Sequence, residues 1–234
     1  MGADPATARS EAAGDSASRR ELAVARSLDP ARARAEKRVQ RFLDAALELM
    51  SAPDTRDFTV QQVVDRSGQS LRSFYQYFDG KYELLLALFE ESVAQAAEQL
   101  AESMGGHDDP LERLRAFVAA YYRLCTPPPS NADPASGRTG LNPHAIAEFA
   151  QQLLTEHPRE ATQAFAPLVE LLLEVLDEAS EVGAIRDDLD NRRVAGVLLQ
   201  AIMFNAFSAT ISGTPLRDGD DALLDIVFRG LVTE

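Results

Sequence analysis

The sequence predicts an all-α protein of about nine helices, and three observations support this fold class. Apolar side chains recur at spacings of three and four residues almost everywhere after residue 36, which is the period of an amphipathic helix. No alternation of apolar and polar residues, as expected for a strand, is sustained along the chain. Glycine and proline fall mainly between the apolar runs, where helices start and stop.

Most of the expected helices have a start or stop signal. The first carries an apolar stripe from Val39 to Met50. Two short helices follow, capped by Thr59 and Ser70 and separated by Gly68. After the first helix the expected ranges are about 59–66, 70–78, 81–104, 110–125, 142–155, 158–183, 190–210 and 220–231.

Composition limits the class of protein. With 234 residues and 45% apolar content, the chain can bury a substantial core. Cys125 is the only cysteine, which excludes an intramolecular disulfide and a cysteine-rich zinc site, and we interpret it as a small apolar side chain. No run of 18 apolar residues exists, and the N-terminal residues lack the apolar run of a signal peptide. The sequence therefore predicts a cytoplasmic protein without a membrane-spanning segment.

The charge of the chain is distributed unevenly. Its net charge is −14, yet residues 1–81 hold 13 Lys and Arg against 12 Asp and Glu, whereas residues 82–234 hold 10 against 25. The acidic charge therefore belongs to the C-terminal two thirds. Cations that converge in a near-neutral domain can bind phosphate, while an acidic body limits non-specific adhesion.

The two short helices around Gly68 have the pattern of a helix-turn-helix. Phe74 and Phe78 share a face with Val63 and Val64 of the preceding helix, so these side chains are expected to form a small core. Two short capped helices can also be ordinary packing, but the complete spacing favours DNA binding. The rest of the second helix is then expected to face outward with Leu71, Arg72, Ser73, Gln76 and Tyr77.

This outward set suits the major groove of DNA. Arg72 can donate two hydrogen bonds to guanine, Gln76 can pair with adenine, and Leu71 can contact a thymine methyl group. A bidentate contact contributes about 1–3 kcal/mol of discrimination, so Arg72 is the leading specificity residue. Ser70 and Gln61 belong to the same predicted site. Phenol, hydroxyl and ammonium groups suited to phosphate are supplied by Tyr75, Tyr77, Thr59 and Lys81.

The segment FTVQQVVDRSGQSLRSFYQYFDGKYELLLALFEE resembles the DNA-binding signature of the TetR family of transcriptional regulators. Three positions depart from the usual pattern, at Gln69, Arg72 and Tyr77, and they make the operator sequence hard to infer. The resemblance covers about residues 37–90, with a weaker likeness in GAIRDDLDNRRVAGVLL. The positions that agree are Thr59, Val63, Gly68, Ser70, Phe74, Tyr75, Phe78, Lys81 and Leu84.

The resemblance implies a DNA-binding domain over residues 35–81 and a ligand-binding and dimerisation domain over residues 82–234. Residues 1–34 are expected to be a disordered polar tail. The cations that precede Phe42 either contact DNA as an arm or form a solvated helix start. They are Arg32, Arg34, Lys37, Arg38 and Arg41.

One recognition helix covers only a few base pairs, so a homodimer on a palindromic operator is expected. The last two helices are expected to supply its interface, although their apolar faces can instead be buried within one subunit. The apolar residues concerned are Val194, Val197, Leu198, Ala201, Ile202, Ala209, Leu223, Leu224, Val227, Phe228 and Leu231.

Between the two ends, aromatic and methionine side chains are either ordinary core or the wall of a pocket. The resemblance implies a small-molecule inducer there, which we expect to be lipid-like or hydrophobic and cyclic. The proline-rich segment 126–141 is expected to be a loop at the mouth of this pocket. The candidate ligand-binding residues are Phe117, Tyr121, Phe149, Phe165, Met203 and Phe204.

Other functions find no support in the sequence. No nucleophile and base constellation or glycine-rich phosphate loop is present, so no enzyme and no cofactor are expected. His107, His144 and His157 lack the spacing of metal ligands. The alternative to a DNA-binding repressor is a helical adaptor that has the fold without operator affinity.

Overall fold

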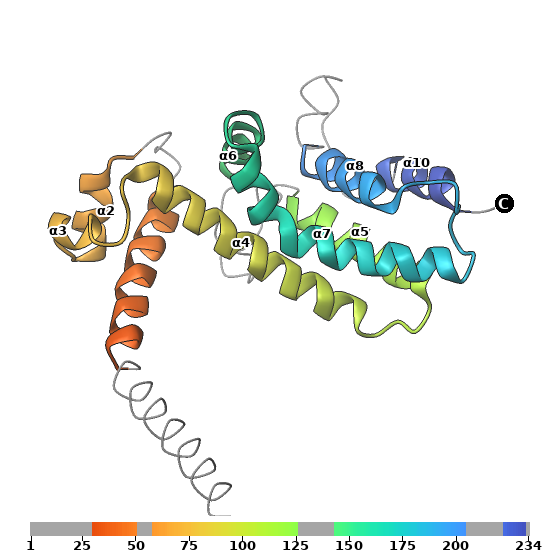
Figure 1. The fold of residues 1–234 in the computed structure, drawn as a ribbon, viewed down its shortest axis with the longest axis horizontal. Helices are drawn as coiled ribbons and strands as arrows, with labels where there is room; N and C mark the ends of the chain where they lie inside the picture. The colour runs from red at the N-terminus through yellow and green to blue at the C-terminus, as the bar shows by residue number, and fades with distance from the viewer. Residues whose placement is uncertain (1–29, 51–57, 126–142, 205–221, 233–234) are drawn as a thin grey trace, which may run out of the picture.

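The computed structural model describes residues 30–50, 58–125, 143–204 and 222–232. These residues form nine helices, and the β-structure among them is one isolated bridge between Ile185 and Val232. A small group of helices lies at one end of the molecule, and the long helix α4 joins it to a larger helical body (Figure 1). The predicted fold class and the number of helices are therefore confirmed for the described residues.

The first helix is described over residues 30–50 and begins no later than residue 30. Its C-terminal half buries Phe42, Ala46 and Leu49, as the apolar stripe predicts. The expected tail boundary was wrong, because residues 30–34 are helical. Alternating alanine and arginine favour a helix there even before the buried stripe begins. Residues 1–29 of the predicted tail lie outside the described residues.

The helix α2 (Val60–Ser67) has the predicted start and stop. The Thr59 hydroxyl accepts a hydrogen bond from the Gln62 N–H (3.3 Å), and the Gln62 side chain accepts one from the Thr59 N–H (2.8 Å). This reciprocal capping box satisfies two backbone donors. Gly68 follows with a φ of 64°, a left-handed conformation that glycine adopts without a Cβ penalty.

The helix α3 (Leu71–Phe74) is shorter than the range 70–78 that the sequence predicts. Ser70 caps it as expected, accepting a hydrogen bond from the Ser73 N–H at 3.1 Å. After Phe74 the backbone tightens into a turn over residues 75–77, where the Tyr77 N–H donates to the Phe74 carbonyl (2.9 Å). Such bonds between residues three apart close a narrower coil than an α-helix.

The helix α4 (Lys81–Met104) has the predicted bounds and belongs to both ends of the molecule. Its Leu84 and Leu88 pack with the core of the N-terminal helices, whereas Leu100 and Met104 pack in the core of the body. The next helix, α5 (Pro110–Cys125), is capped by Asp109, whose carboxylate accepts from the N–H groups of Leu111 and Glu112 (2.7 and 3.2 Å).

Four helices complete the body: α6 (Pro143–Glu156), α7 (Pro158–Glu181), α8 (Asn191–Met203) and α10 (Ala222–Leu231). Asp190 caps α8, which ends at Met203 and is thus shorter than the expected range to residue 210. Residues 205–210 and the proline-rich segment 126–141 lie outside the described residues.

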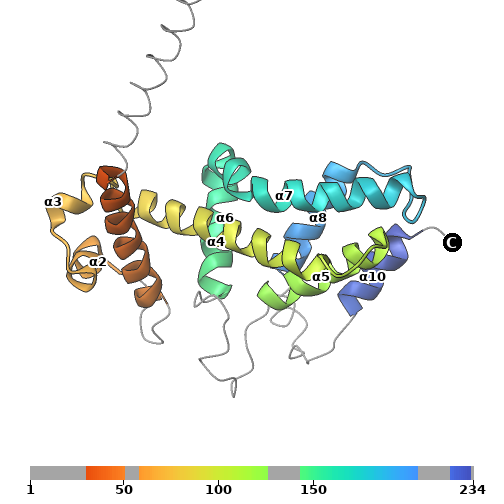
Figure 2. The same cartoon turned by 90° about the horizontal axis from the view of Figure 1, so that it is seen from below.

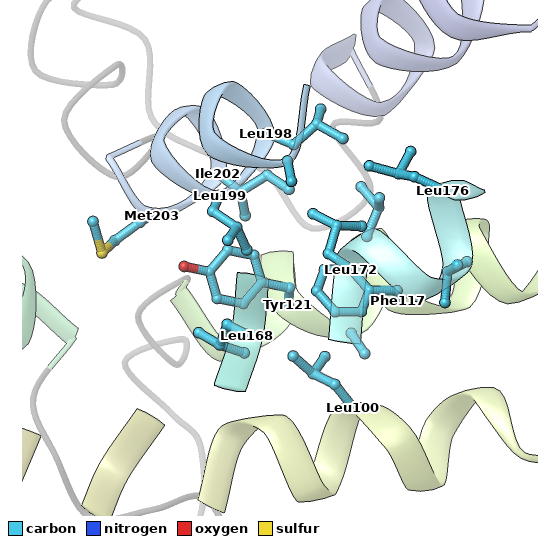
Figure 3. Close-up of a cluster of buried hydrophobic side chains, with 14 of the residues drawn as sticks. Leu100, Phe117, Tyr121, Leu168, Leu172, Leu176, Leu198, Leu199, Ile202 and Met203 are labelled. Carbon is cyan, nitrogen blue, oxygen red and sulfur yellow. The ribbon is translucent and has the colours of Figure 1, made fainter. Parts of the chain in front are cut away.

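Helix α7 is the centre of the body and packs against α4, α5, α6 and α8. Its Leu168, Leu172 and Leu176 point between the facing helices (Figure 3). Phe117 and Tyr121 approach from α5, and an apolar row of α8 closes the cluster from the other side. Burial of this continuous core is the main favourable term that holds the body together.

Candidate nucleic-acid interface

An aromatic core fixes the orientation of α3. Phe74 is fully buried, with its ring centroid 5.4 Å from Phe42 in an edge-to-face arrangement and 5.4 Å from Phe78. Val63 and Val64 of α2 are buried in the same cluster, as predicted. Because these contacts come from three segments, α3 cannot rotate about its axis without breaking aromatic contacts that are favourable by about 0.5–1.5 kcal/mol each.

The outer side of α3 presents the side chains that the sequence predicts for the groove. Arg72 and Gln76 are exposed, and Leu71 is 42% exposed although it is apolar. Tyr75 is exposed at 55% and is therefore no core residue. An exposed cluster of guanidinium, amide and apolar groups on a fixed helix matches the chemistry of base edges.

Two residues of the predicted outward set are not fully outward. Ser73 and Tyr77 are half-buried, and Tyr77 packs against the N-terminal core. The tight turn explains this correction, because residues three apart nearly eclipse each other and Tyr77 follows the buried Phe74. Ser73 lies four residues before Tyr77 on the same side, and its hydroxyl is buried without a hydrogen-bond partner among the described residues.

Two of the residues expected to meet phosphate, Thr59 and Lys81, already have contacts within the protein, and so does Gln61 of the predicted site. The Thr59 hydroxyl works in the capping box, and the Gln61 amide donates to Asp65 (2.7 Å). Lys81 is half-buried, and its Nζ lies 4.3 Å from the centroid of the Phe58 ring. Lys81 still stands at the N-terminus of α4, where Gly80 supplies no side-chain cap and the helix dipole favours an anion.

The predicted ligand-binding residues fall into two groups of one core. The ring centroids of Phe117 and Tyr121 lie 6.1 Å apart, and buried Met203 belongs to the same core (Figure 3). Phe149 and Phe165 instead surround Phe89, at 5.7 and 5.3 Å between ring centroids. The structure thus brings these residues into a continuous apolar interior, to which half-buried Phe204 also belongs.

An open pocket of about 270 Å³ lies between α4 and α5 and has a different lining. It combines apolar groups with an amide, a hydroxyl and a guanidinium, and none of the predicted ligand-binding residues contributes to it. No sequence motif around Arg123 marks this pocket, so it was not predicted. The lining residues are Gln99, Leu100, Ser103, Ala120, Arg123 and Leu124.

Tyr82 is a second residue that sequence reasoning missed. It stands in the first turn of α4, and its ring lies 4.5 Å from that of His157 at the junction of α6 and α7. The pKa of its phenol is raised by burial and by the carboxylates of Glu160 and Glu156. Its hydroxyl is buried without a hydrogen-bond partner among the described residues. Tyr82 therefore connects the DNA-facing end of the molecule to the body.

The apolar residues of α8 and α10 divide between the core and the surface. Leu198, Ile202, Phe228 and Leu231 are buried within the subunit, so these four members of the predicted dimer face belong to the core. Val197 is 65% exposed. Ala201 is also exposed, whereas Val194 and Val227 are half-buried. On the neighbouring helix Ile226 is 70% exposed, and the sequence analysis did not single it out.

Metal-binding and membrane-spanning features are absent from the part of the chain that the structure describes. Those residues contain no group of three or more His, Cys, Asp or Glu side chains that could hold a metal ion. In the same ranges, no helix is long and apolar enough to cross a bilayer.

This geometry, a short exposed helix held by a capped partner helix and an aromatic core, defines a helix-turn-helix DNA-binding protein. Residues 42–88 match the family described as bacterial regulatory proteins of the tetR family. The matched stretch holds the helix-turn-helix and the start of α4, so the chain is similar to the DNA-binding transcriptional regulators of this family.

Relatives and solved structures agree in fold over most of the chain. The fatty acid metabolism regulator protein of Bacillus subtilis is 22% identical over 181 residues, which span 76% of this chain and 83% of that protein. FadR from Bacillus subtilis in complex with stearoyl-CoA has a TM-score of 0.59 at 19% identity, covering 83% of this chain and 97% of that one. FadR from Bacillus halodurans has a TM-score of 0.58 at 20% identity, with 82% and 92% covered.

Proposed function

We propose that the chain is a repressor that binds a palindromic operator as a homodimer and releases it when a small apolar ligand binds. The observation that supports this proposal is the exposure of Arg72 and Gln76 on a recognition helix whose orientation the buried Phe74 fixes. In this proposal residues 30–81 form the DNA-binding unit and residues 82–234 the sensing and pairing unit. A chain that binds operator DNA acts where the chromosome lies, so we place it in the cytoplasm at the nucleoid.

Base preference is the first test. DNA fragments bound by the full chain are selected from a random pool, and the affinity of each variant for the selected sequence and its point changes is then measured. Arg72→Ala is expected to relax the preference at one base position, because a bidentate contact is worth about 1–3 kcal/mol there. Arg159→Ala, an exposed arginine on α7, serves as the control with the same loss of charge.

Phosphate binding by Lys81 predicts an effect on affinity that does not depend on the base sequence. Lys81→Ala is expected to weaken binding to all sequences alike and to reduce the salt slope of the affinity by about one unit. Unchanged preference in Arg72→Ala together with an unchanged slope in Lys81→Ala would contradict the assignment of α3 and the start of α4 as the DNA-binding site.

For the ligand we infer a long apolar chain with a small polar part, which deepens the lipid-like expectation from the sequence. The interior formed by Phe117, Tyr121, Phe149 and Phe165 is apolar, which suits the burial of such a chain. Two of the similar proteins named above, a fatty acid metabolism regulator and a protein solved with stearoyl-CoA, favour an acyl chain.

Stearoyl-CoA is the probe for this inference, with coenzyme A alone as the control for the head group. Added to a complex of the chain with labelled operator, stearoyl-CoA is expected to release the DNA, and coenzyme A is not. The half-buried Phe165 offers a variant, Phe165→Trp, which should weaken the response by filling space while leaving operator affinity intact. Release by neither compound would refute an acyl-chain inducer and leave the DNA-binding proposal standing.

The other candidate is a helical adaptor without operator affinity. A wild-type chain that selects no sequence from the random pool and shows no salt-dependent binding would favour this candidate. Ligand binding by the body would then be the function to pursue.

A further inference from the structure

Four cations line one face of the first helix outside the helix-turn-helix. Arg34, Lys37, Arg38 and Arg41 are spaced by three and four residues, which places them on one side of an α-helix. All four side chains are exposed. The buried stripe of the same helix follows only from Phe42 onward, so the row precedes the part that the fold needs.

The charge of this segment is concentrated and largely uncompensated. Residues 30–41 hold five cations and one carboxylate, Glu36, in a chain whose net charge is −14. Glu36 pairs with Arg32 at 2.8 Å, and both stand on the opposite side of the helix from the row. Lys37, Arg38 and Arg41 have no ion-pair partner among the described residues. The row is therefore a local positive patch on an acidic protein.

The row lies on the side of the helix that faces α2. Arg34, Arg41 and Glu48 are seven residues apart and share a face, and Glu48 pairs with Arg66 of α2 at 3.0 Å. Gln40 points elsewhere, since its amide donates to Glu91 of α4. In both views the helix 30–50 stands beside α2 and α3, at the end remote from α8 and α10 (Figures 1 and 2). In Figure 1 its N-terminal half extends past them.

We propose that this cationic row is a second DNA-binding surface, which binds the phosphates of the duplex beside the groove that receives α3. The inference rests on the proposed function and adds to it a contact that carries no base information. From Arg34 to Arg41 the helix rises about 10 Å, and one DNA strand presents a phosphate about every 3.4 Å along the axis. The row can therefore face about three phosphates, and charge complementarity makes a polyanion its fitting partner.

The test removes the four charges in the full chain with Arg34→Gln, Lys37→Gln, Arg38→Gln and Arg41→Gln together. Glutamine keeps the helix propensity of the segment, so circular dichroism and the thermal transition should stay unchanged. Operator affinity is measured between 50 and 200 mM salt. We expect the slope of log affinity against log salt to fall by about two to three units and the base preference to remain.

Two control variants make the same kind of substitution, arginine to glutamine, outside the row. Arg32→Gln changes the opposite side of the same helix and should leave the slope within about half a unit of wild type. A variant with Arg115, Arg159, Arg192 and Arg193 all changed to Gln removes the same net charge from the body and should also retain the slope. If the fourfold variant does not fold, Arg38→Gln alone repeats the test. This single substitution is expected to reduce the slope by about one unit.

The outcomes separate the two proposals. A fourfold variant that keeps the wild-type slope overturns the row as a DNA surface, whereas a wild-type chain without operator binding overturns the proposed function itself. Vesicles of phosphatidylserine and phosphatidylcholine supply the competing partner. Sedimentation with them that depends on the row, together with an unchanged DNA slope, would assign the row to a membrane surface and refute the DNA proposal.

Discussion

At the residue scale, Gly68 holds the turn between α2 and α3. Its φ of 64° lies in the left-handed region, and an added Cβ would meet no atom within 4 Å. The cost of substitution is therefore a backbone cost, about 1–2 kcal/mol for an L-residue in this region. Gly68→Ala should lower the free energy of unfolding by that amount, measured by urea denaturation.

Gly80 offers a matched control in the same part of the chain. Its φ of 177° is extended backbone that any residue adopts, and a methyl group placed there would likewise find open space. Gly80→Ala should change stability by no more than a few tenths of a kcal/mol. Equal effects of the two substitutions would contradict the assignment of the turn to the left-handed conformation of Gly68.

The thiol of Cys125 makes stability depend on pH. Burial raises its pKa from 9.0 to about 12 and also raises the pKa of the neighbouring Tyr121 phenol well above its usual value. Above about pH 9 the unfolded thiol ionises while the folded thiol stays neutral, so the free energy of unfolding falls as pH rises towards 12. Below pH 9 both states are neutral and this contribution is constant.

Urea unfolding at pH 8.0, 9.5 and 10.5 measures this effect. The wild-type chain should lose stability over that range with a slope of up to about 1.4 kcal/mol per pH unit from the thiol. Cys125→Ala should lose less, retaining only the part due to Tyr121 and other groups. Parallel pH profiles for the two chains would show that the thiol is not buried in the way described.

At the element scale, the cap of α2 and the phosphate role expected for Thr59 can be told apart. Thr59→Ala removes the acceptor for the Gln62 N–H and should destabilise the fold by about 1 kcal/mol, whereas Thr59→Ser keeps the cap. Calorimetry of both variants measures the cap. If Thr59 acts through the cap alone, the salt slope of operator binding stays at the wild-type value in Thr59→Ala, and a slope reduced by about one unit would reveal a direct phosphate contact.

Elements whose boundaries depend on local signals were predicted well. The caps at Thr59 and Ser70 follow from side chains that bond the neighbouring backbone, whereas the stop of α2 and both ends of α4 coincide with glycines. The end of the predicted tail at residue 34 was placed too late because the periodicity of apolar residues marks the buried stripe and not the whole helix. Residues 30–38 form helix with little burial.

Helical periodicity predicted the exposure of only some residues of the candidate site. Exposure of Arg72 and Gln76 follows from the burial of Phe74 and Phe78 on one helical face. Tyr77 was misplaced because the backbone leaves the α-helical period after Phe74, and no residue pattern signals that turn. The contact of Tyr82 was not predicted because its partner His157 is distant in the sequence, and such contacts depend on how separate helices pack.

At the scale of the whole molecule, α4 is the element through which ligand binding in the body could reach the DNA-facing end. It contributes Leu84 to the N-terminal core and Leu100 to the core of the body. The Tyr82 ring at its start also touches His157 between α6 and α7. Close-packed cores respond to strain by shifting whole elements. A ligand that repositions α6 or α7 is therefore expected to move α4 and the attached recognition helix together.

Among the described residues, the proposed dimer would have only a small exposed apolar surface on α8 and α10, because Leu198, Ile202, Phe228 and Leu231 are buried inside the subunit. Val197 and Ile226 remain exposed at 65% and 70% on these two helices. Paired across a two-fold axis, they would bury apolar area in the middle of a four-helix interface. Val197→Glu and Ile226→Glu should each convert the dimer to a monomer, measured by sedimentation velocity, while the helical content stays unchanged.

Val182 provides the control, since it is exposed at the same 65% but stands at the C-cap of α7. Val182→Glu should leave the dimer intact. A monomer has one recognition helix, so Val197→Glu should also lose the preference for two half-sites separated by about one turn of DNA, roughly 34 Å. If Val197→Glu remains dimeric and Val182→Glu does not, the subunits pair through the far end of α7, and the spacing of the half-sites must be derived from that arrangement instead.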